Sequence, residues 1–428
     1  MIYVVETGDT LMEIARRLGT SAARLRSDNG LLPRQALVPG QALVVLRPTA
    51  SYTVQPGDSL YAIADQAGIS VLELLQYNPV LAQGQPLFPG ESLALGLEGN
   101  RFGPVTVTSY AYPFNSIPTL QRALPFLTDL SVFSYGFRED GSLIIPQDSA
   151  LLVEAARFGV GAVLVLTAIE EDGSFSTQQA SRLFQDQALQ DQVLSALLDV
   201  MREKGYIGLD VDFEYIPRAE AAAFHAFLRN ARDRLHREGF FLHVDLAPKS
   251  YAGQPGLLYE GHDYSVIGSI ADSVLLMTYE WGYAFGPPMA VAPMPQVESV
   301  LRYALSVIPA QKVKLGVPNY GYDWTLPHRQ GSRAVTIGNQ EAVLLASQMG
   351  AEIHFDESAQ APFFHYIREG REHVVWFEDA RSIASKLDLA RRLSLAGWSY
   401  WNLLRPFPQN WAWVSENVLV RRRKPAAF

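Results

Sequence analysis

The stretch Tyr206-Ile-Gly-Leu-Asp-Val-Asp-Phe-Glu214 decides the fold of this chain. It places three acids, Asp210, Asp212 and Glu214, at alternate positions and apolar residues between them. Successive side chains of a β-strand point to opposite faces, so the three acids would share one face, roughly 6–7 Å apart. Closely spaced buried carboxylates repel one another and do not all ionise. The pattern therefore predicts a strand that carries a proton-transfer site, and a solvated acidic strand is the alternative.

Similar short apolar runs alternate with helical patterns from Val105 onward. We expect strands at Val105–Tyr110, Leu130–Tyr135, Gly161–Thr167, Gly208–Glu214, Phe241–Ala247, Ser273–Tyr279, Lys314–Pro318 and Gly397–Trp401. Eight alternations of strand and helix predict an α/β fold, a (β/α)8 TIM barrel. Catalytic groups of such barrels lie at the carboxyl ends of the strands. Glu214, Tyr279 and Trp401 stand at three of these expected ends.

A repeat fills the N-terminal part of the chain. Tyr3-Val-Val-Glu-Thr-Gly-Asp-Thr-Leu11 returns as Tyr52-Thr-Val-Gln-Pro-Gly-Asp-Ser-Leu60, and Pro48–Ser51 is expected to join the two copies. Each copy predicts a strand, two helices and a second strand, with a glycine in the first turn. Asp9 and Asp58 directly precede an apolar helical pattern, so we expect them to be helix N-caps.

Composition narrows the classes of function. The chain has 428 residues and a net charge of −9, which argues against nucleic acid or an anionic membrane as the main partner. It has no cysteine, which excludes disulfides and thiolate metal sites. No apolar run is long enough for a transmembrane helix, so we expect no membrane insertion. The first residues lack the pattern of a signal peptide. If the native chain begins at Met1, we expect it not to use the usual secretory route.

The repeat resembles the LysM module, whose marks include the Tyr-Val strand, Gly-Asp-Thr or Gly-Asp-Ser, a later Asn and a final Pro-Gly. The resemblance implies two βααβ modules, at residues 1–47 and 51–96, that bind polymers containing N-acetylglucosamine, namely peptidoglycan or chitin. It places the glycan between the first turn and the loop after the second helix. The matching residues are Gly8, Asp9, Thr10, Leu11, Asn29, Gly57, Asp58, Ser59, Leu60 and Asn78. Two weak sites would raise avidity; a spacer repeat is the alternative.

The segment Gly208-Leu-Asp-Val-Asp-Phe-Glu214 is similar to the signature of glycoside hydrolase family 18, usually Asp-Gly-x-Asp-x-Asp-x-Glu. Met277-Thr-Tyr-Glu280 and Tyr400-Trp401 resemble motifs at the ends of the sixth and eighth strands of that family. The first signature Asp is Ile207 here. By alternation position 207 faces the helices, so we expect its loss to affect packing more than proton chemistry.

This resemblance also gives the domain boundaries. It covers residues 105–413, within a catalytic barrel that we place at residues 104–428. The span from about 325 to 378 is too long for a plain loop and resembles the small α+β insertion of many members. The basic tail Arg421-Arg-Arg-Lys424 is expected to be a solvated terminus.

Resemblance to this family implies a retaining reaction whose nucleophile is the 2-acetamido oxygen of the substrate. Glu214 would be the general acid and later the base, and nearby carboxylates would raise its pKa. Asp212 would hold the acetamido N–H, Asp210 would set the state of Asp212, and Tyr279 would orient the acetamido oxygen. Substrate contacts are expected from Trp401, Glu280, Asn319, Tyr110, Tyr135 and Trp281, with Tyr320 and Tyr322 as further candidates. The reaction needs neither a metal ion nor an organic cofactor.

Three functions remain open from the sequence. Two LysM modules before a family 18 barrel resemble spore-associated N-acetylglucosaminidases that act on cortex peptidoglycan or its fragments. We therefore expect a monomer in the spore coat or cortex. A chitinase of the same mechanism is the first alternative, and a non-catalytic glycan-binding spore coat protein is the second.

Overall fold

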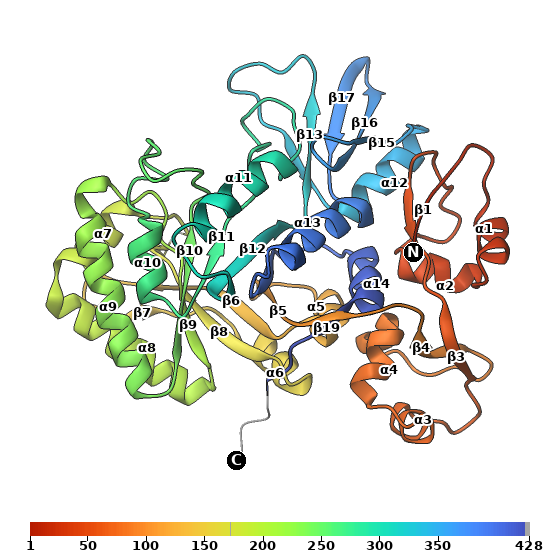
Figure 1. The fold of residues 1–428 in the computed structure, drawn as a ribbon, viewed down its shortest axis with the longest axis horizontal. Coiled ribbons are helices and arrows are strands. Elements are labelled where there is room, and N and C mark those ends of the chain that lie inside the picture. The colour runs from red at the N-terminus through yellow and green to blue at the C-terminus, as the bar shows by residue number, and fades with distance from the viewer. Residues whose placement is uncertain (172, 424–428) are drawn as a thin grey trace.

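Eight parallel strands close into a barrel in the computed structural model, which describes residues 1–171 and 173–423 (Figure 1). They are neighbours in the order β5, β6, β8, β9, β10, β11, β12 and β18, and β18 pairs with β5 to close the ring. Their bounds are β5 Phe102–Ala111, β6 Asp129–Phe137, β8 Gly161–Leu166, β9 Gly208–Val211, β10 Phe241–Leu246, β11 Ser273–Leu276, β12 Val313–Pro318 and β18 Gly397–Trp401. The predicted TIM barrel and its eight strands are confirmed.

Helices cover the outside of the barrel. They are α5 Ile117–Ala123, α6 Ser149–Arg157, α7 Thr177–Gln185, α8 Gln187–Lys204, α9 Ala221–Arg237, α10 Tyr264–Ile270, α11 Met294–Leu305, α13 Ala380–Arg392 and α14 Pro408–Asn417. In α9 the buried side chains Phe224, Phe227, Leu228 and Ala231 recur every three or four residues, which makes one apolar stripe. Within the described residues, every helix is too short or too polar to cross a membrane.

Shorter elements complete the barrel domain. Strand β7 (Leu143–Ile144) pairs with β6, and β19 (Val418–Val420) pairs with β5. The 3-10 helices η2, η3 and η4 lie at Leu124–Phe126, Arg218–Glu220 and Ala310–Lys312.

An α+β insertion stands between β12 and α13 (Figure 1). Its five strands are ordered β14-β13-β17-β16-β15. Their bounds are β13 Gly321–Thr325, β14 Val335–Ile337, β15 His354–Asp356, β16 Ala361–Arg368 and β17 Arg371–Trp376, with helix α12 at Asn339–Met349. Val38 from the first N-terminal module is part of the same apolar cluster as α12, β16 and β17. The insertion and that module therefore share a core.

The two N-terminal modules have the predicted βααβ order. Module 1 contains β1 Ile2–Val4, α1 Leu11–Arg17, α2 Ala22–Asp28 and β2 Ala42–Val44. Module 2 contains β3 Pro48–Thr53, α3 Leu60–Ala67, α4 Val71–Tyr77, the 3-10 helix η1 Pro79–Gln83 and β4 Ser92–Leu97. The expectation that Pro48–Ser51 only joins the copies is wrong, because these residues begin β3 and pair with β4.

The N-caps also differ from the prediction. Thr10 and Ser59 cap α1 and α3, one residue after the expected aspartates. Asp58 instead accepts hydrogen bonds from the Tyr52 hydroxyl at 2.9 Å and the Gln55 N–H at 2.7 Å. Asp9 accepts the equivalent bonds from Tyr3 and Glu6. The two aspartates therefore close the first turn of each module.

The repeated asparagines hold each module together from within. Asn78 is 6% exposed, accepts from the Ala94 N–H at 2.8 Å and donates to the Ala94 and Leu74 carbonyls at 2.8 and 2.9 Å. Asn29 makes the same three bonds to Val44 and Leu25. Each amide joins the second helix to the last strand. The polar side-chain atoms of both asparagines are therefore bonded inside the fold, and a glycan contact of the segments that contain them stays a prediction.

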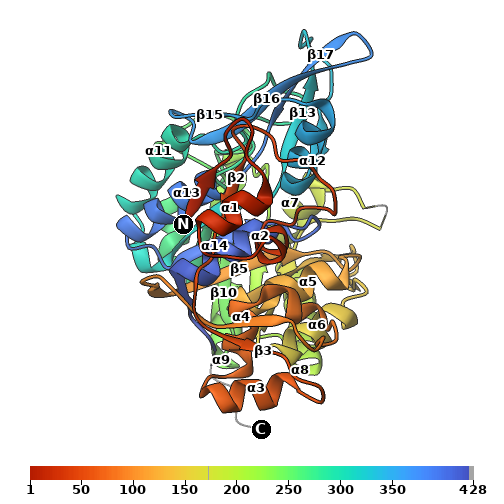
Figure 2. The same cartoon turned by 90° about the vertical axis from the view of Figure 1, so that its right-hand side faces the viewer.

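Module 1 is docked on the catalytic domain (Figure 2). The Gln409 amide of α14 donates to the Ala42 carbonyl at 2.7 Å, and the Ile353 N–H donates to the Pro39 carbonyl at 3.0 Å. Gly40 has a φ of +80°, and a Cβ there would lie 1.7 Å from the Ile353 carbonyl oxygen. Only glycine permits this close approach.

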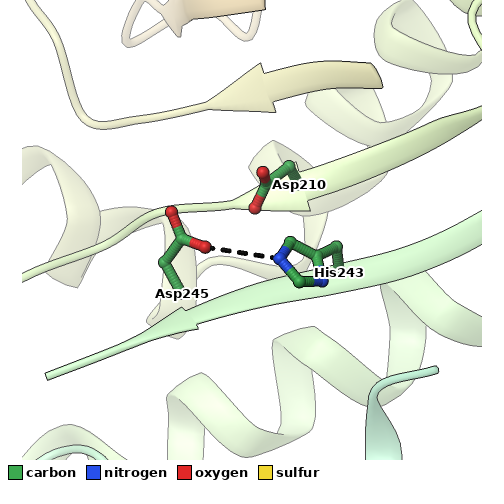
Figure 3. Close-up of side chains that lie close together, drawn as sticks. All are labelled: Asp210, His243 and Asp245. Carbon is green, nitrogen blue, oxygen red and sulfur yellow. Dashed lines mark ion pairs between the residues drawn. The ribbon is translucent and has the colours of Figure 1, made fainter. Parts of the chain in front are cut away.

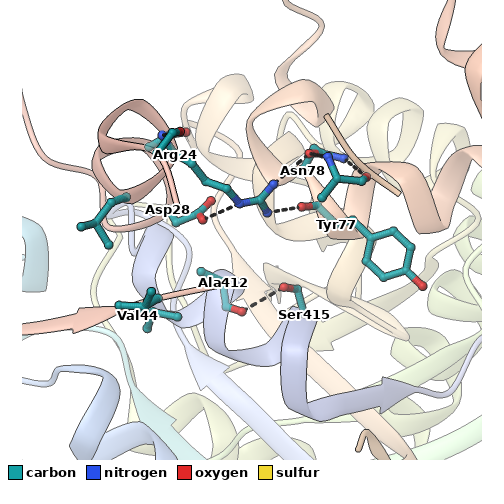
Figure 4. Close-up of polar contacts among 12 residues, drawn as sticks. Arg24, Asp28, Val44, Tyr77, Asn78, Ala412 and Ser415 are labelled. Carbon is teal, nitrogen blue, oxygen red and sulfur yellow. Dashed lines mark hydrogen bonds and ion pairs between the residues drawn. The ribbon is translucent and has the colours of Figure 1, made fainter. Parts of the chain in front are cut away.

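Arg24 of α2 joins the two modules (Figure 4). Its guanidinium pairs with Asp28 at 3.1 Å and donates to the Tyr77 carbonyl at 2.6 Å and to Asn78 Oδ1 at 3.3 Å. Burial raises the pKa of Asp28, whereas the charges of Arg24 and Arg122 lower it. The modules therefore meet through a buried ion network.

The basic tail is not a solvated terminus. Arg422 donates to the Leu127 and Phe158 carbonyls, and Arg423 pairs with Asp129 at 2.5 and 2.9 Å. Strand β19 pairs with β5 and carries these arginines across the end of the barrel. Lys424 and the last residues of the expected barrel domain lie outside the described residues.

Replacement of Asn78 by alanine is expected to lower the free energy of unfolding of module 2 by about 2–3 kcal/mol, because it leaves buried backbone groups without partners. Amide hydrogen exchange in β4 should accelerate with it, as mass spectrometry can measure. Asn100→Ala, at an exposed position between module 2 and the barrel, is the control. Unchanged exchange in β4 would contradict the role given to Asn78.

Candidate active site

A cavity of about 690 Å³ opens at the carboxyl ends of the barrel strands. Strand β9 ends at Val211, so Asp212 and Glu214 lie on the segment just beyond it and line the cavity. The other lining side chains are mostly aromatic or apolar and include Tyr112, Phe114, Phe133, Phe175 and Trp401. The cavity therefore combines an apolar wall with two carboxyl groups.

Asp210 lies below the cavity, inside the barrel, and is fully buried. The Tyr110 hydroxyl is 2.9 Å from Asp210 Oδ2 and 2.7 Å from Asp245 Oδ2, and the Ser131 hydroxyl donates to Asp210 at 3.2 Å. One tyrosine hydroxyl carries a single proton, so it cannot donate fully to two carboxylates. A second proton on one of the carboxyl groups satisfies all of these contacts. Burial raises the pKa of Asp210 to about 6 and that of Asp245 well above its usual range.

Figure 3 shows the Asp245 carboxyl turned toward Asp210 and His243, and His243 Nε2 lies 3.6 Å from Asp245 Oδ1. Donor atoms of these three residues lie within 4.8 Å of one another, as in a metal site. The Tyr110 hydroxyl already bonds both carboxyl groups, however, and the buried ammonium of Lys314 offsets their charge. These contacts explain the cluster as a proton-sharing network, and we assign no metal to it.

The two cavity carboxyls are both shifted toward the protonated form. Burial raises the pKa of Asp212 well above its usual range, and the charges of Glu214 and Asp210 raise it further. Glu214 is exposed to the cavity, but protein surrounds it closely enough that lost hydration raises its pKa. The charge of Glu280 adds to this rise. A carboxyl that keeps its proton near neutral pH can act as a general acid.

Glu280 follows the sixth barrel strand in a left-handed conformation, with φ at 67°. The Tyr320 and Tyr322 hydroxyls donate to its carboxylate, the latter at 2.9 and 3.2 Å. Burial raises the pKa of Glu280, and both tyrosine bonds lower it. The tyrosines therefore hold a carboxylate beside the acid group.

Trp401 lines the cavity, and Tyr279 is buried beside its acids. The pKa of Tyr279 is raised by burial and by the charges of Asp245, Asp212 and Glu214, which places its hydroxyl among these acids. Trp401 lines the cavity, and its ring meets Phe133 and Tyr110 edge to face at 5.0 and 5.2 Å. The packing fixes the indole as a platform.

Two of the expected substrate contacts are wrong in position. Tyr135 is fully buried and donates to Asp148, because an irregularity in the pairing of β6 with β8 between Val132 and Tyr135 shifts the alternation. Asn319 is buried and donates to the Asn402 and Arg405 carbonyls at 2.7 and 2.9 Å, which ties two loops together.

The other two expected contacts, Tyr110 and Trp281, differ in where their side chains lie. Tyr110 is buried beneath the cavity, where its hydroxyl holds Asp210 and Asp245 rather than a ligand. Trp281 is partly buried against the barrel core, and its backbone N–H donates to the Val291 carbonyl at 3.1 Å.

Several residues of the site escaped the sequence analysis. Asp245 and His243 alternate within the expected strand Phe241–Ala247, so period-2 spacing could have indicated their inward position. Tyr112 and Phe114 directly follow another expected strand. No pattern in the sequence placed Lys314 at the site, because one lysine in an apolar strand does not reveal which acids it meets.

Asp245→Asn is expected to change the free energy of unfolding by less than about 1 kcal/mol at neutral pH, because an amide mimics a protonated carboxyl. Asp245→Ala is expected to cost about 1–3 kcal/mol, since it strips the Tyr110 hydroxyl of a partner. Urea denaturation of both variants measures the difference. Equal losses would show that Asp245 is ionised in the folded chain.

Comparison with known proteins agrees with this geometry. The model of the glycosyl hydrolases family 18 matches residues 165–405, and the LysM domain model matches residues 3–45 and 52–96. The cortical fragment-lytic enzyme of Bacillus anthracis is 37% identical over 431 residues, which cover 99% of this chain and 99% of that protein. Its namesake from Bacillus subtilis (strain 168) is 41% identical over 305 residues, or 71% of this chain and 70% of that protein.

The crystal structure of the spore cortex-lytic enzyme SleL from Bacillus cereus is similar over the whole fold. Its TM-score is 0.82 at 37% sequence identity, with 99% of this chain and 98% of that chain covered. The chain belongs to the glycosyl hydrolases of family 18 and carries two LysM domains before its catalytic barrel.

Proposed function

We propose that this protein hydrolyses N-acetylglucosaminyl bonds in the peptidoglycan of the spore cortex, or in fragments of it. The observation that carries the proposal is the position of Glu214, which lines the cavity beside Asp212 with a raised pKa. The names of the full-length relatives support the choice of cortex over chitin. A spore-associated monomer is part of the proposal.

In the proposed reaction Glu214 donates its proton to the glycosidic oxygen as the bond to C1 breaks. The 2-acetamido oxygen of the same sugar attacks C1 and forms an oxazolinium ion, with retention over the two steps. Asp212 accepts the acetamido N–H and balances the positive charge. Water then attacks C1, and Glu214 takes a proton from it, which restores the acid.

Neighbouring groups prepare this chemistry. Asp210 and Asp245 share a proton below the site, so Asp212 faces fewer full negative charges. Tyr279 would donate to the acetamido oxygen and hold it near C1. Trp401 would lie under the apolar face of the sugar, and Glu280 would bind a sugar hydroxyl.

Glu214→Gln is expected to lower kcat on soluble cortex fragments about 100- to 10,000-fold, because the amide cannot donate the proton. Mass spectrometry should find new N-acetylglucosamine reducing ends with the wild type and far fewer with the variant. Glu139→Gln, which makes the same change at a side chain 81% exposed, is the control.

Cleavage of chitin oligomers but of no cortex fragment would favour the chitinase instead. Binding of both polymers without cleavage would favour the non-catalytic coat protein.

Glu280→Gln is expected to move the alkaline limb of the pH profile of kcat/KM to lower pH. The Glu280 charge raises the pKa of Glu214, so its removal lowers that pKa. Glu214 would then lose its proton, and the enzyme its activity, at a lower pH. An alkaline limb that stays in place, or moves to higher pH, would contradict this coupling.

A further inference from the structure

A cavity of about 420 Å³ lies where module 2 meets the end of α6. Module 2 lines it with Leu60, Val71, Leu72, Leu75, Leu81, Ala82, Gly84 and Gln85, and the barrel adds Arg157 and Phe158. Leu60 and Leu81 come from the two segments between which the LysM resemblance places a glycan. The catalytic domain therefore supplies one wall of the expected glycan groove.

The barrel wall is held in a fixed position. Phe158 packs against both the core of module 2 and the core of the barrel. The Arg157 guanidinium lies 5.6 Å from the centre of the Phe158 ring, with 57% of its side chain exposed. Its nearest acid, Glu154, is 3.7 Å away and already accepts from the Gln121 amide at 3.0 Å. Arg157 therefore keeps donors for a ligand, since a guanidinium has five N–H groups.

The matching loop of module 1 is used differently. Asn29, Gly30 and Leu31 face α12 and α14 across a space of about 20 Å³. That space is far smaller than the cavity of about 420 Å³ beside module 2. The Gly30 carbonyl also accepts a hydrogen bond from Gln340. This loop therefore serves docking, whereas the loop of module 2 borders an open cavity.

We propose that module 2 and α6 together form a binding site for a peptidoglycan strand, in which Arg157 pairs with a carboxylate of the strand. The leucines would contact the C–H faces and acetyl methyl groups of the sugars. Peptidoglycan carries carboxylates on its peptide groups and on lactyl groups without a peptide, whereas chitin is neutral. The ion pair between Arg157 and this carboxylate would therefore favour binding of peptidoglycan over chitin. This inference rests on the proposed function and deepens it, because it assigns polymer choice to a residue outside the active site.

Binding of the full chain to insoluble polymers tests the proposal, in the Glu214→Gln background so that cleavage does not interfere. The polymers are peptidoglycan, peptidoglycan with amidated carboxyl groups, and chitin. Arg157→Glu is expected to weaken binding to peptidoglycan about 3- to 10-fold, since an exposed ion pair is modest in strength and its reversal adds repulsion. Binding to chitin and to amidated peptidoglycan should stay within twofold. Arg157→Lys, which keeps the charge, should retain most of the binding.

Arg302→Glu on α11, with 73% of its side chain exposed, makes the same charge change elsewhere and should bind like the parent. Raised salt should weaken peptidoglycan binding by the Glu214→Gln parent more than binding by the variant that also carries Arg157→Glu. Unchanged binding of Arg157→Glu to peptidoglycan, or an equal loss on chitin, would overturn the proposal.

Cleavage is measured separately in the wild-type background. If cortex fragments are cut but Arg157→Glu binds normally, this inference fails and the proposed function stands. If nothing is cut but binding depends on Arg157, the proposed function fails instead.

Discussion

The cost of placing carboxyl groups inside a closed barrel governs this structure. Strand β9 turns Asp210 into the barrel interior, where its carboxyl is fully buried and its charge is costly. The cost of burying this carboxyl is offset by hydrogen bonds from Tyr110 and Ser131 and by the charge of the buried Lys314. Asp245 and Asp210 share a proton. Each of these partners comes from a different barrel strand, so the barrel must close before the acids are stabilised. The site and the fold therefore depend on the same contacts.

Each N-terminal module, by contrast, has a hydrogen-bonded centre of its own. One buried asparagine per module bonds three backbone groups and fixes the last strand against the second helix. Docking then uses the outer surfaces, through Gly40, Arg24 and Gln409. The two copies share a fold but not a surface, because module 1 is packed against the insertion and α14 while module 2 borders α6.

Alternating patterns were sufficient to predict the barrel and the acid row, and the repeat with its LysM resemblance was sufficient to predict both modules. Alternation failed where one irregular step intervenes, as at Tyr135, whose strand shifts register before it. It did not reveal the internal hydrogen bonds of Asn29 and Asn78, since the sequence does not show whether an amide faces a ligand or its own backbone. Lys314 and Asp245 became visible only when distant strands were brought together. The roles of the cavity residues remain proposals drawn from their geometry and family.

The docking of module 1 also imposes an order on the folding of the chain during its synthesis. Its partners lie on α12, directly before β15 and on α14, between Asn339 and Asn417, more than two thirds of the chain away. A ribosome releases the N-terminal segments first. Module 1 can therefore fold early, but its face around Gly40 stays exposed to solvent until α12 and α14 have been synthesised. Module 1 can thus dock only after α14 has been synthesised, when most of the catalytic domain already exists.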